Sequence, residues 1–132
     1  SVIRPADTGA DGLATERAHV GHVSDGASNV WETIGLTKTL LDHEGWGRVA
    51  VEMRLTLIDA YVPGDLVEQI SGLIEATDRT IHFRHYQFEA RTGRLVAIVE
   101  AIGLAMNLTT RKAVRFSDDV IAAAPRLSAA GA

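Results

Sequence analysis

The chain has 132 residues, no cysteine, and 13 basic against 17 acidic side chains, which gives a formal net charge of −4. This length suits one domain with its own core, and 46% hydrophobic with 23% charged residues exclude disorder, collagen-like repetition and a coiled coil. The lack of cysteine excludes disulfides, thiolate metal sites and a cysteine nucleophile, and it favours a cytoplasmic setting. The acidic balance and the 5% aromatic content argue against nucleic acid as a partner.

No stretch of the sequence is expected to cross a membrane. The longest apolar run extends over residues 95–108 and is interrupted by Glu100 and Asn107. It is shorter than the roughly 20 residues that a membrane-spanning helix needs. We therefore expect no membrane partner.

In chain order, residues 1–12 come first and lack any apolar periodicity. They predict a loose lead-in to a single domain over residues 13–118. Residues 14–23 show no clean alternation and are expected to form at most a short first strand. The Ala-rich residues 119–132 predict a peripheral C-terminal tail.

A long helix is predicted over residues 27–43. Its apolar residues recur at the spacing of one helical face: Ala27, Val30, Trp31, Ile34 and Leu41. Ser24 or Asp25 is a suitable N-cap, because its side-chain oxygen can accept from the free amides of the first turn. Gly45 is a suitable C-terminal stop, and Gly35 is expected within the helix.

Four antiparallel strands are predicted after the helix, over residues 48–57, 66–74, 80–90 and 95–108. Alternating apolar and polar residues indicate these strands. Turn residues separate them at Pro63-Gly64-Asp65, Asp78-Arg79 and Arg91-Thr92-Gly93. Residues 95–108 are apolar on both faces, so we expect a central strand. One helix covers only one face of such a sheet, which predicts a homodimer or homotetramer.

Several short motifs occur in a recognisable order along this pattern. They are Gly21-His22-Val23, Val62-Pro63-Gly64-Asp65, Arg79-Thr80-Ile81-His82-Phe83, Gly93-Arg94-Leu95-Val96-Ala97 and residues 107–114. Over about residues 14–118 the chain resembles the hotdog-fold acyl-CoA thioesterases of the 4-hydroxybenzoyl-CoA thioesterase type. The resemblance implies an α+β hotdog fold, in which one long helix packs on a long antiparallel sheet, and an oligomer. It implies an acyl-CoA substrate, with coenzyme A as part of that substrate and no separate cofactor.

The sequence departs from the family's pattern around its histidine. Many relatives carry an Asp four residues before that histidine, where this chain has Ala18, and an Asn-Asn pair after it, where this chain has Ser24-Asp25. Asp25 is therefore the leading candidate for the catalytic carboxylate, as general base or nucleophile. Its alternative role is a helix cap.

The residues around Asp25 complete the predicted site. Gly26 and neighbouring amides at a helix N-terminus would polarise the thioester carbonyl. His22 matches the family's histidine and would orient a loop or contact substrate, or it is a structural histidine. Ser24 would hydrogen-bond substrate or cap the helix, and Asn29, one turn into the helix, would contact the acyl group or lie in solvent.

Arg111 and Lys112, after the last strand, are candidates for binding the phosphates of coenzyme A, or they are ordinary surface charges. Glu100, a lone acid in an apolar strand, is a reserve candidate for a catalytic acid; the alternative is that it faces an interface or forms an ion pair with Arg84 or Arg94.

Two His-x-x-His pairs, His19 with His22 and His82 with His85, are the only pattern that suggests a metal. The second pair lies in a predicted strand, where residues three apart point to opposite faces and cannot chelate one ion. We expect no metal site.

Two further functions stay open. A hotdog dehydratase or hydratase would need Asp25 and His22 to converge on one substrate carbon. A non-catalytic acyl-CoA or small-ligand binding domain is favoured by Ala18 at the usual acid position. Shared fold alone does not decide among these classes.

Overall fold

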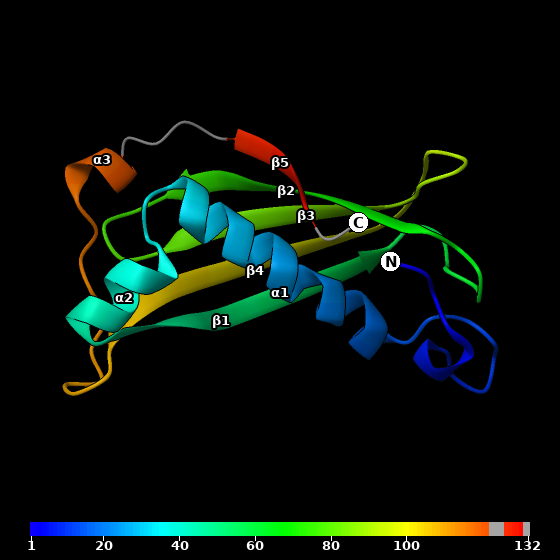
Figure 1. Cartoon of the computed structure of the whole chain (residues 1–132), viewed down its shortest axis with the longest axis horizontal. Coiled ribbons are helices and arrows are strands. Elements are labelled where there is room, and N and C mark those ends of the chain that lie inside the picture. Colours follow the sequence, from blue (N-terminus) through cyan, green and yellow to red (C-terminus); the bar gives the residue numbers. More distant parts are fainter. Residues whose placement is uncertain (122–125, 131–132) are drawn as a thin grey trace.

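One long helix lies across a five-stranded antiparallel sheet (Figure 1). The computed structural model describes residues 1–121 and 126–130; of Ser24, Asp25, Asp119 and residues 126–130 it describes the backbone alone. The helices are η1 (Pro5–Asp7), α1 (Glu16–Thr33), α2 (Lys38–Glu44) and α3 (Asp118–Ile121), and the strands are β1 (Trp46–Leu57), β2 (Val67–Ala76), β3 (Ile81–Glu89), β4 (Arg94–Asn107) and β5 (Arg126–Ala130). The strand order is β1-β4-β3-β2-β5.

The predicted helix over residues 27–43 is wrong at its start and in its continuity. Thr15 caps α1, because its hydroxyl accepts from the amide of Ala18 at 3.2 Å. Residues 16–23 are therefore helical, and the short strand expected within residues 14–23 is absent from this described segment. The chain leaves α1 through Gly35, whose φ of 89° breaks the helix before α2.

The four predicted strands are present with ends shifted by a few residues at most. β4 lies between β1 and β3, which confirms the central position predicted for residues 95–108. Gly45, at φ 72°, ends α2 as predicted. The alternation in β3 is regular: odd residues from Ile81 to Glu89 are buried, and the even ones are half-buried on the other face.

Both predicted peripheral ends contact the sheet. Ile3 is only 2% exposed, and its amide donates to the carbonyl of Asp65 at 2.9 Å. Residues 126–130, within the expected tail, form β5 and pair with β2; residues 122–125 and 131–132 lie outside the described part of the chain.

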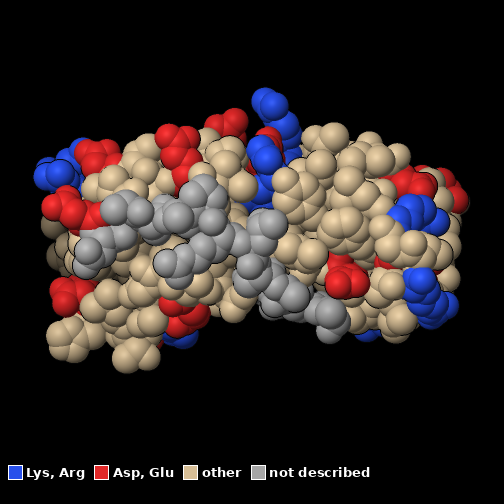
Figure 2. Space-filling model, turned by 90° about the horizontal axis from the view of Figure 1, so that it is seen from above, with Lys and Arg blue, Asp and Glu red and all other residues tan. Residues whose placement is uncertain are grey.

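The main core lies between α1 and the inner face of the sheet. Its centre is Trp31, which packs edge-on against Phe83 with ring centroids 5.5 Å apart, and Phe116 closes the far side at 6.3 Å. On the face shown in Figure 2, basic side chains gather at the two ends and at the middle of the upper edge, and acidic side chains are spread among them. Among the described helices, none is long and apolar enough to span a membrane.

Candidate functional site

The segment that carries the predicted site, residues 21–26, lies inside α1 and not at its N-terminus. Only the first four amides of a helix lack an intrahelical acceptor, and here they belong to the turn that follows Thr15. The prediction that Gly26 and its neighbours present free amides is therefore wrong, and so is the N-cap role of Ser24 or Asp25. The side chains of Ser24 and Asp25 lie outside the described residues.

Gly26 is instead a point of very close approach between α1 and the sheet. A Cβ atom there would collide with Ser71 Oγ, would lie 2.5 Å from Gln69 Nε2 and would lie 3.0 Å from His85 Nδ1. Contacts this short are not tolerated by real side chains. Glycine at this position therefore sets the distance between the helix and strands β2 and β3.

A layer of buried polar side chains fills the space beneath this part of the helix. Gln87 Oε1 lies 2.8 Å from His19 Nδ1, and Gln87 Nε2 donates to the His19 carbonyl at 2.8 Å and to Gln69 Oε1 at 3.0 Å. Gln69 Nε2 donates to the His22 carbonyl at 2.7 Å. These bonds fix the helix over its second turn, because buried polar groups keep such partners.

A serine–histidine pair completes the layer. Ser71 Oγ lies 2.8 Å from His85 Nδ1, and both side chains are fully buried. Burial lowers the pKa of His85 to about 4, so the ring is neutral at ordinary pH. The spacing suits proton transfer from a hydroxyl, but neither group can meet a substrate atom, so we interpret the pair as structural.

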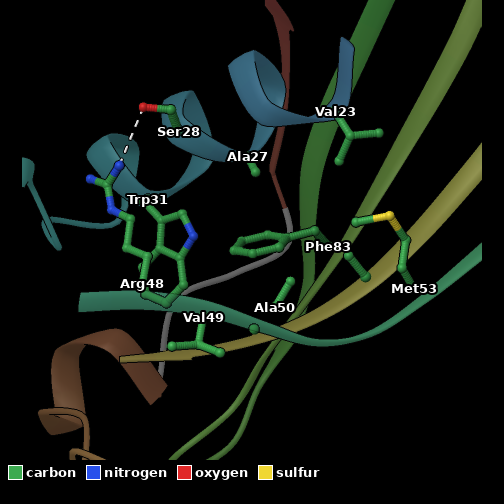
Figure 3. Close-up of a pocket in the computed structure, with 11 residues that line it drawn as sticks. Val23, Ala27, Ser28, Trp31, Arg48, Val49, Ala50, Met53 and Phe83 are labelled. Carbon is green, nitrogen blue, oxygen red and sulfur yellow. Dashed lines mark hydrogen bonds between the residues drawn. The ribbon is translucent and has the colours of Figure 1, made fainter. Parts of the chain in front are cut away.

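An apolar pocket opens between α1 and the edge strand β1 (Figure 3). Its volume is about 240 Å³, and it is lined mainly by Val23, Ala27, Trp31, Met53, Phe83 and Gly103. Val23 and Ala27 lie on the turns of the helix that flank Asp25. Concave apolar sites with few polar groups are typical of ligand pockets.

Arg48 and Ser28 form the polar rim of this pocket. The Arg48 guanidinium lies 5.7 Å from the centre of the Trp31 ring. It donates to Ser28 Oγ at 3.3 Å, to Glu32 Oε1 at 3.1 Å and to the Leu36 carbonyl at 2.9 Å. The Glu32 carboxylate neutralises the charge of Arg48. The exposed Ser28 hydroxyl is the acceptor in its bond with Arg48, so its own proton can be donated to another group.

A second, polar cleft of about 590 Å³ lies at the start of α1. Its lining includes Arg4, Arg17 and His22, with Asp7 paired to Arg4 at 3.6 Å. His22 lines this cleft, and the next residue, Val23, lines the apolar pocket. The two cavities therefore meet the helix at adjacent residues.

Comparison with known proteins places the chain in a family. The model of the thioesterase-like superfamily matches residues 3–124. The chain belongs to this superfamily. Its hotdog fold is shared with solved structures, whereas no curated protein sequence matches it.

Three solved structures illustrate the likeness. A Staphylococcus aureus protein in complex with CoA has 13% identity and a TM-score of 0.79, over 91% of this chain and 75% of that one. A probable thioesterase of Escherichia coli has 13% identity and a TM-score of 0.77, over 91% and 90%. A 1,4-dihydroxy-2-naphthoyl-CoA thioesterase of Synechocystis has 12% identity and a TM-score of 0.74, over 90% and 88%.

The remaining predicted residues of this thioesterase-like chain lie apart from one another. His22 is half-buried beside the polar cleft, and Asn29 is half-buried one turn beyond Asp25. Arg111 and Lys112 are exposed on the turn after β4. That turn packs beside the end of α2, where the Leu108 amide donates to the Gly45 carbonyl, and neither basic residue lines either cavity.

Glu100 forms an ion pair with Arg84, which is one of the alternatives that the sequence predicted. Its Oε1 accepts from Arg84 Nε at 2.9 Å and lies 2.7 Å from Arg84 Nη2, on the outer face of the sheet. His82 is half-buried and His85 fully buried on opposite faces of β3. Within the described residues, no three His, Asp or Glu side chains gather closely enough to hold a metal.

The sequence interpretation missed the polar layer and the pocket. A signal for the layer was present: Gln69, Ser71, His85 and Gln87 occupy the alternating positions of β2 and β3 that face the helix. No local signal marked the pocket, because its residues come from α1 and three strands far apart in the sequence.

Proposed function

We propose that the protein hydrolyses acyl-CoA thioesters at the turn of α1 that carries Asp25. The observation that carries this proposal is the apolar pocket beside that turn, which would hold the acyl group. Membership of the thioesterase-like superfamily supports the same reaction class.

In the proposed mechanism the Asp25 carboxylate takes a proton from water or attacks the thioester carbonyl itself. Since the amides of this turn are engaged within the helix, the carbonyl oxygen must be polarised by a side chain. The Ser28 hydroxyl, one turn after Asp25, has a proton available and lines the pocket. The tetrahedral intermediate then collapses, and coenzyme A leaves as a thiolate that takes up a proton, which in the general-base route is the one that Asp25 took from water. In the nucleophilic route the acyl group stays on Asp25 as an anhydride, and a water molecule then hydrolyses it to release the acid and restore the carboxylate.

The coenzyme A portion would lie in the polar cleft, which meets α1 at His22, next to Val23 of the acyl pocket. Arg4 and Arg17 would meet its phosphates and His22 would contact the chain near the thioester. Ser24 and Asn29 flank Asp25 on the same helix and stay candidates for substrate contacts. The contact predicted for Arg111 and Lys112 stays a prediction, since neither lines these cavities.

We also propose that a second copy covers β1, so that the working unit is a homodimer or a larger homo-oligomer. Val51, Met53 and Leu57 on this edge strand are at least 40% exposed. β1 pairs with β4 on one side, and the described sheet has no strand on its other side. Edge strands of this kind readily pair with another chain. Sedimentation of wild type and Val51→Lys tests this: a monomeric wild type contradicts it.

The central test is hydrolysis of an acyl-CoA panel with detection of the released thiol. Wild type is expected to release coenzyme A, and Asp25→Asn to lose at least about 100-fold in kcat, the scale of a lost proton acceptor. The control is Asp42→Asn, which removes an exposed carboxylate that pairs with Lys38 on α2. Unchanged hydrolysis in Asp25→Asn would contradict the role of Asp25.

One observation favours a second candidate, a non-catalytic acyl-CoA binding domain: α1 engages the very amides that were expected to polarise the carbonyl. Binding of acyl-CoA without thiol release would establish that function. Addition of water to an enoyl-CoA would establish a hydratase instead.

A further inference from the structure

The apolar pocket contains one polar hydrogen-bond donor whose purpose the proposed hydrolysis does not explain. Trp31 is 4% exposed, and its indole N–H has no hydrogen-bond partner within the described part of the chain. In Figure 3 the indole nitrogen lies on the side of the ring that faces Phe83 and the interior of the pocket. Among the described residues the fully enclosed side-chain atoms without a partner are Arg48 Nε and His85 Nε2, so the indole N–H is reached from the pocket and can donate to an occupant there.

The orientation of this donor is fixed. One face of the indole is covered by the Arg48 guanidinium, 5.7 Å from the ring centre. Its edge meets Phe83 in a T-shaped contact with an interplanar angle of 65°. Gly103 lies against the benzo edge, where a Cβ atom would come within 3.2 Å of Trp31 Cζ2. The ring therefore cannot turn its N–H away from the pocket.

The size of the pocket limits what can occupy it. At about 30 Å³ for each non-hydrogen atom, a volume of 240 Å³ holds about eight such atoms. From Val23 to Trp31 the helix rises about 12 Å, which is the depth over which an acyl group would lie beside it. A compact chain or a single ring fits within this space, whereas a long fatty acyl chain would extend out through the open side of the pocket.

The electrostatics limit the charge of the occupant. Arg48 is paired with Glu32 at 3.1 Å, so the pocket offers no unpaired cation for an anionic acyl group. The indole N–H is the donor that the pocket interior presents. A neutral oxygen acceptor at the far end of the occupant would pair with it.

We propose that the pocket selects a compact, uncharged acyl group of about eight non-hydrogen atoms that carries one hydrogen-bond acceptor remote from the thioester, with Trp31 Nε1 as the donor that recognises it. This inference rests on the proposed function for the identity of the ligand as an acyl-CoA. Trp31 is a specificity-determining residue in this account.

The test compares two non-hydrolysable ligands by calorimetry: S-hexyl-CoA and S-(5-oxohexyl)-CoA, which differ by one keto oxygen. Wild type is expected to bind the keto ligand about three- to tenfold more tightly, the range of one neutral hydrogen bond. Trp31→Phe keeps an aromatic ring but removes the N–H, so the preference should vanish or reverse. The control is Trp46→Phe, the same change at a tryptophan outside the pocket, which should keep the wild-type preference.

The same pair as thioesters, hexanoyl-CoA and 5-oxohexanoyl-CoA, then separates the two proposals. A binding preference without thiol release supports the pocket assignment and contradicts hydrolysis. Thiol release with no preference for the keto compound, or the same preference in Trp31→Phe, overturns the inference. Failure of wild type to bind either thioether ligand, or tighter binding of S-hexadecyl-CoA than of both, also overturns it.

Discussion

Gln87 and His19 are joined twice, through their side chains and through the helix backbone. Gln87 Oε1 lies 2.8 Å from His19 Nδ1, and Gln87 Nε2 lies 2.8 Å from the His19 carbonyl oxygen. Because the amide nitrogen of Gln87 is the donor, its oxygen is the acceptor, and His19 Nδ1 must carry the proton. One side chain thereby anchors the first turns of α1 to β3.

We predict that Gln87→Leu destabilises the protein by about 2–4 kcal/mol, because it leaves the buried His19 and Gln69 without partners. Denaturation in urea measures this. The control His82→Leu changes a half-buried residue on the other face of β3 and should cost less than about 1 kcal/mol. Equal losses in the two variants would show that the polar layer does not anchor the helix.

The close approach of the helix to the sheet at Gly26 leads to a second prediction, for which Gly21 in the same helix provides the control. Ala at position 26 would collide with Ser71, so Gly26→Ala should destabilise the protein by about 1–3 kcal/mol or more, although Ala is the better helix former by about 1 kcal/mol. Gly21→Ala, in the same helix, meets nothing within 4 Å and should stabilise it by up to about 1 kcal/mol. The unfolding temperatures of both variants, compared with that of wild type, test this prediction. A higher unfolding temperature in Gly26→Ala would disprove the close contact.

These two contacts also explain why the sequence predicted the strands well and the start of the helix poorly. Alternation in β3 and β4 follows directly from one buried face, so it is visible in the sequence. The buried stripe of α1 includes His19 and Gly26, which are not apolar. Helical periodicity therefore first appears at residue 27, and the sequence predicts the start of the helix at Ser24 or Asp25.

The candidate site, like the fold, could be predicted only in part from the sequence. Asp25 and His22 could be proposed from the sequence because they lie within one short motif, and their roles stay predictions. Trp31, Phe83 and Gly103 converge only after folding, and nothing local links them. The polar partner Ser28 was missed because an exposed serine in a helix carries no signal until Arg48 is placed beside it.

The Arg84–Glu100 pair gives a third prediction. Both side chains are about one-third exposed, so Glu100→Gln should cost no more than about 1 kcal/mol of stability. Glu100 points to the face of the sheet opposite α1 and the pocket, so kcat for acyl-CoA hydrolysis should stay within about twofold of wild type. Thiol-release kinetics measure it, and a 100-fold lower kcat in a folded variant would make Glu100 a catalytic acid.

His85 makes stability depend on pH. Burial holds its pKa at about 4 in the folded protein, against 6.5 for an unperturbed histidine. The unfolded chain therefore binds the extra proton first, and stability present above pH 6.5 is lost as the pH falls toward 4. Between pH 7 and pH 5 we predict a loss of about 2 kcal/mol in the free energy of unfolding.

Urea denaturation at the two pH values measures this loss. His85→Gln should reduce the difference between the two pH values, whereas His43→Gln, at an exposed histidine of α2, should retain it. Glu89 does not interfere, because the Leu66 amide lowers the pKa of that carboxyl below its usual 4.5, beneath the window. Equal stability of wild type at pH 7 and pH 5 would show that His85 is not held neutral by burial.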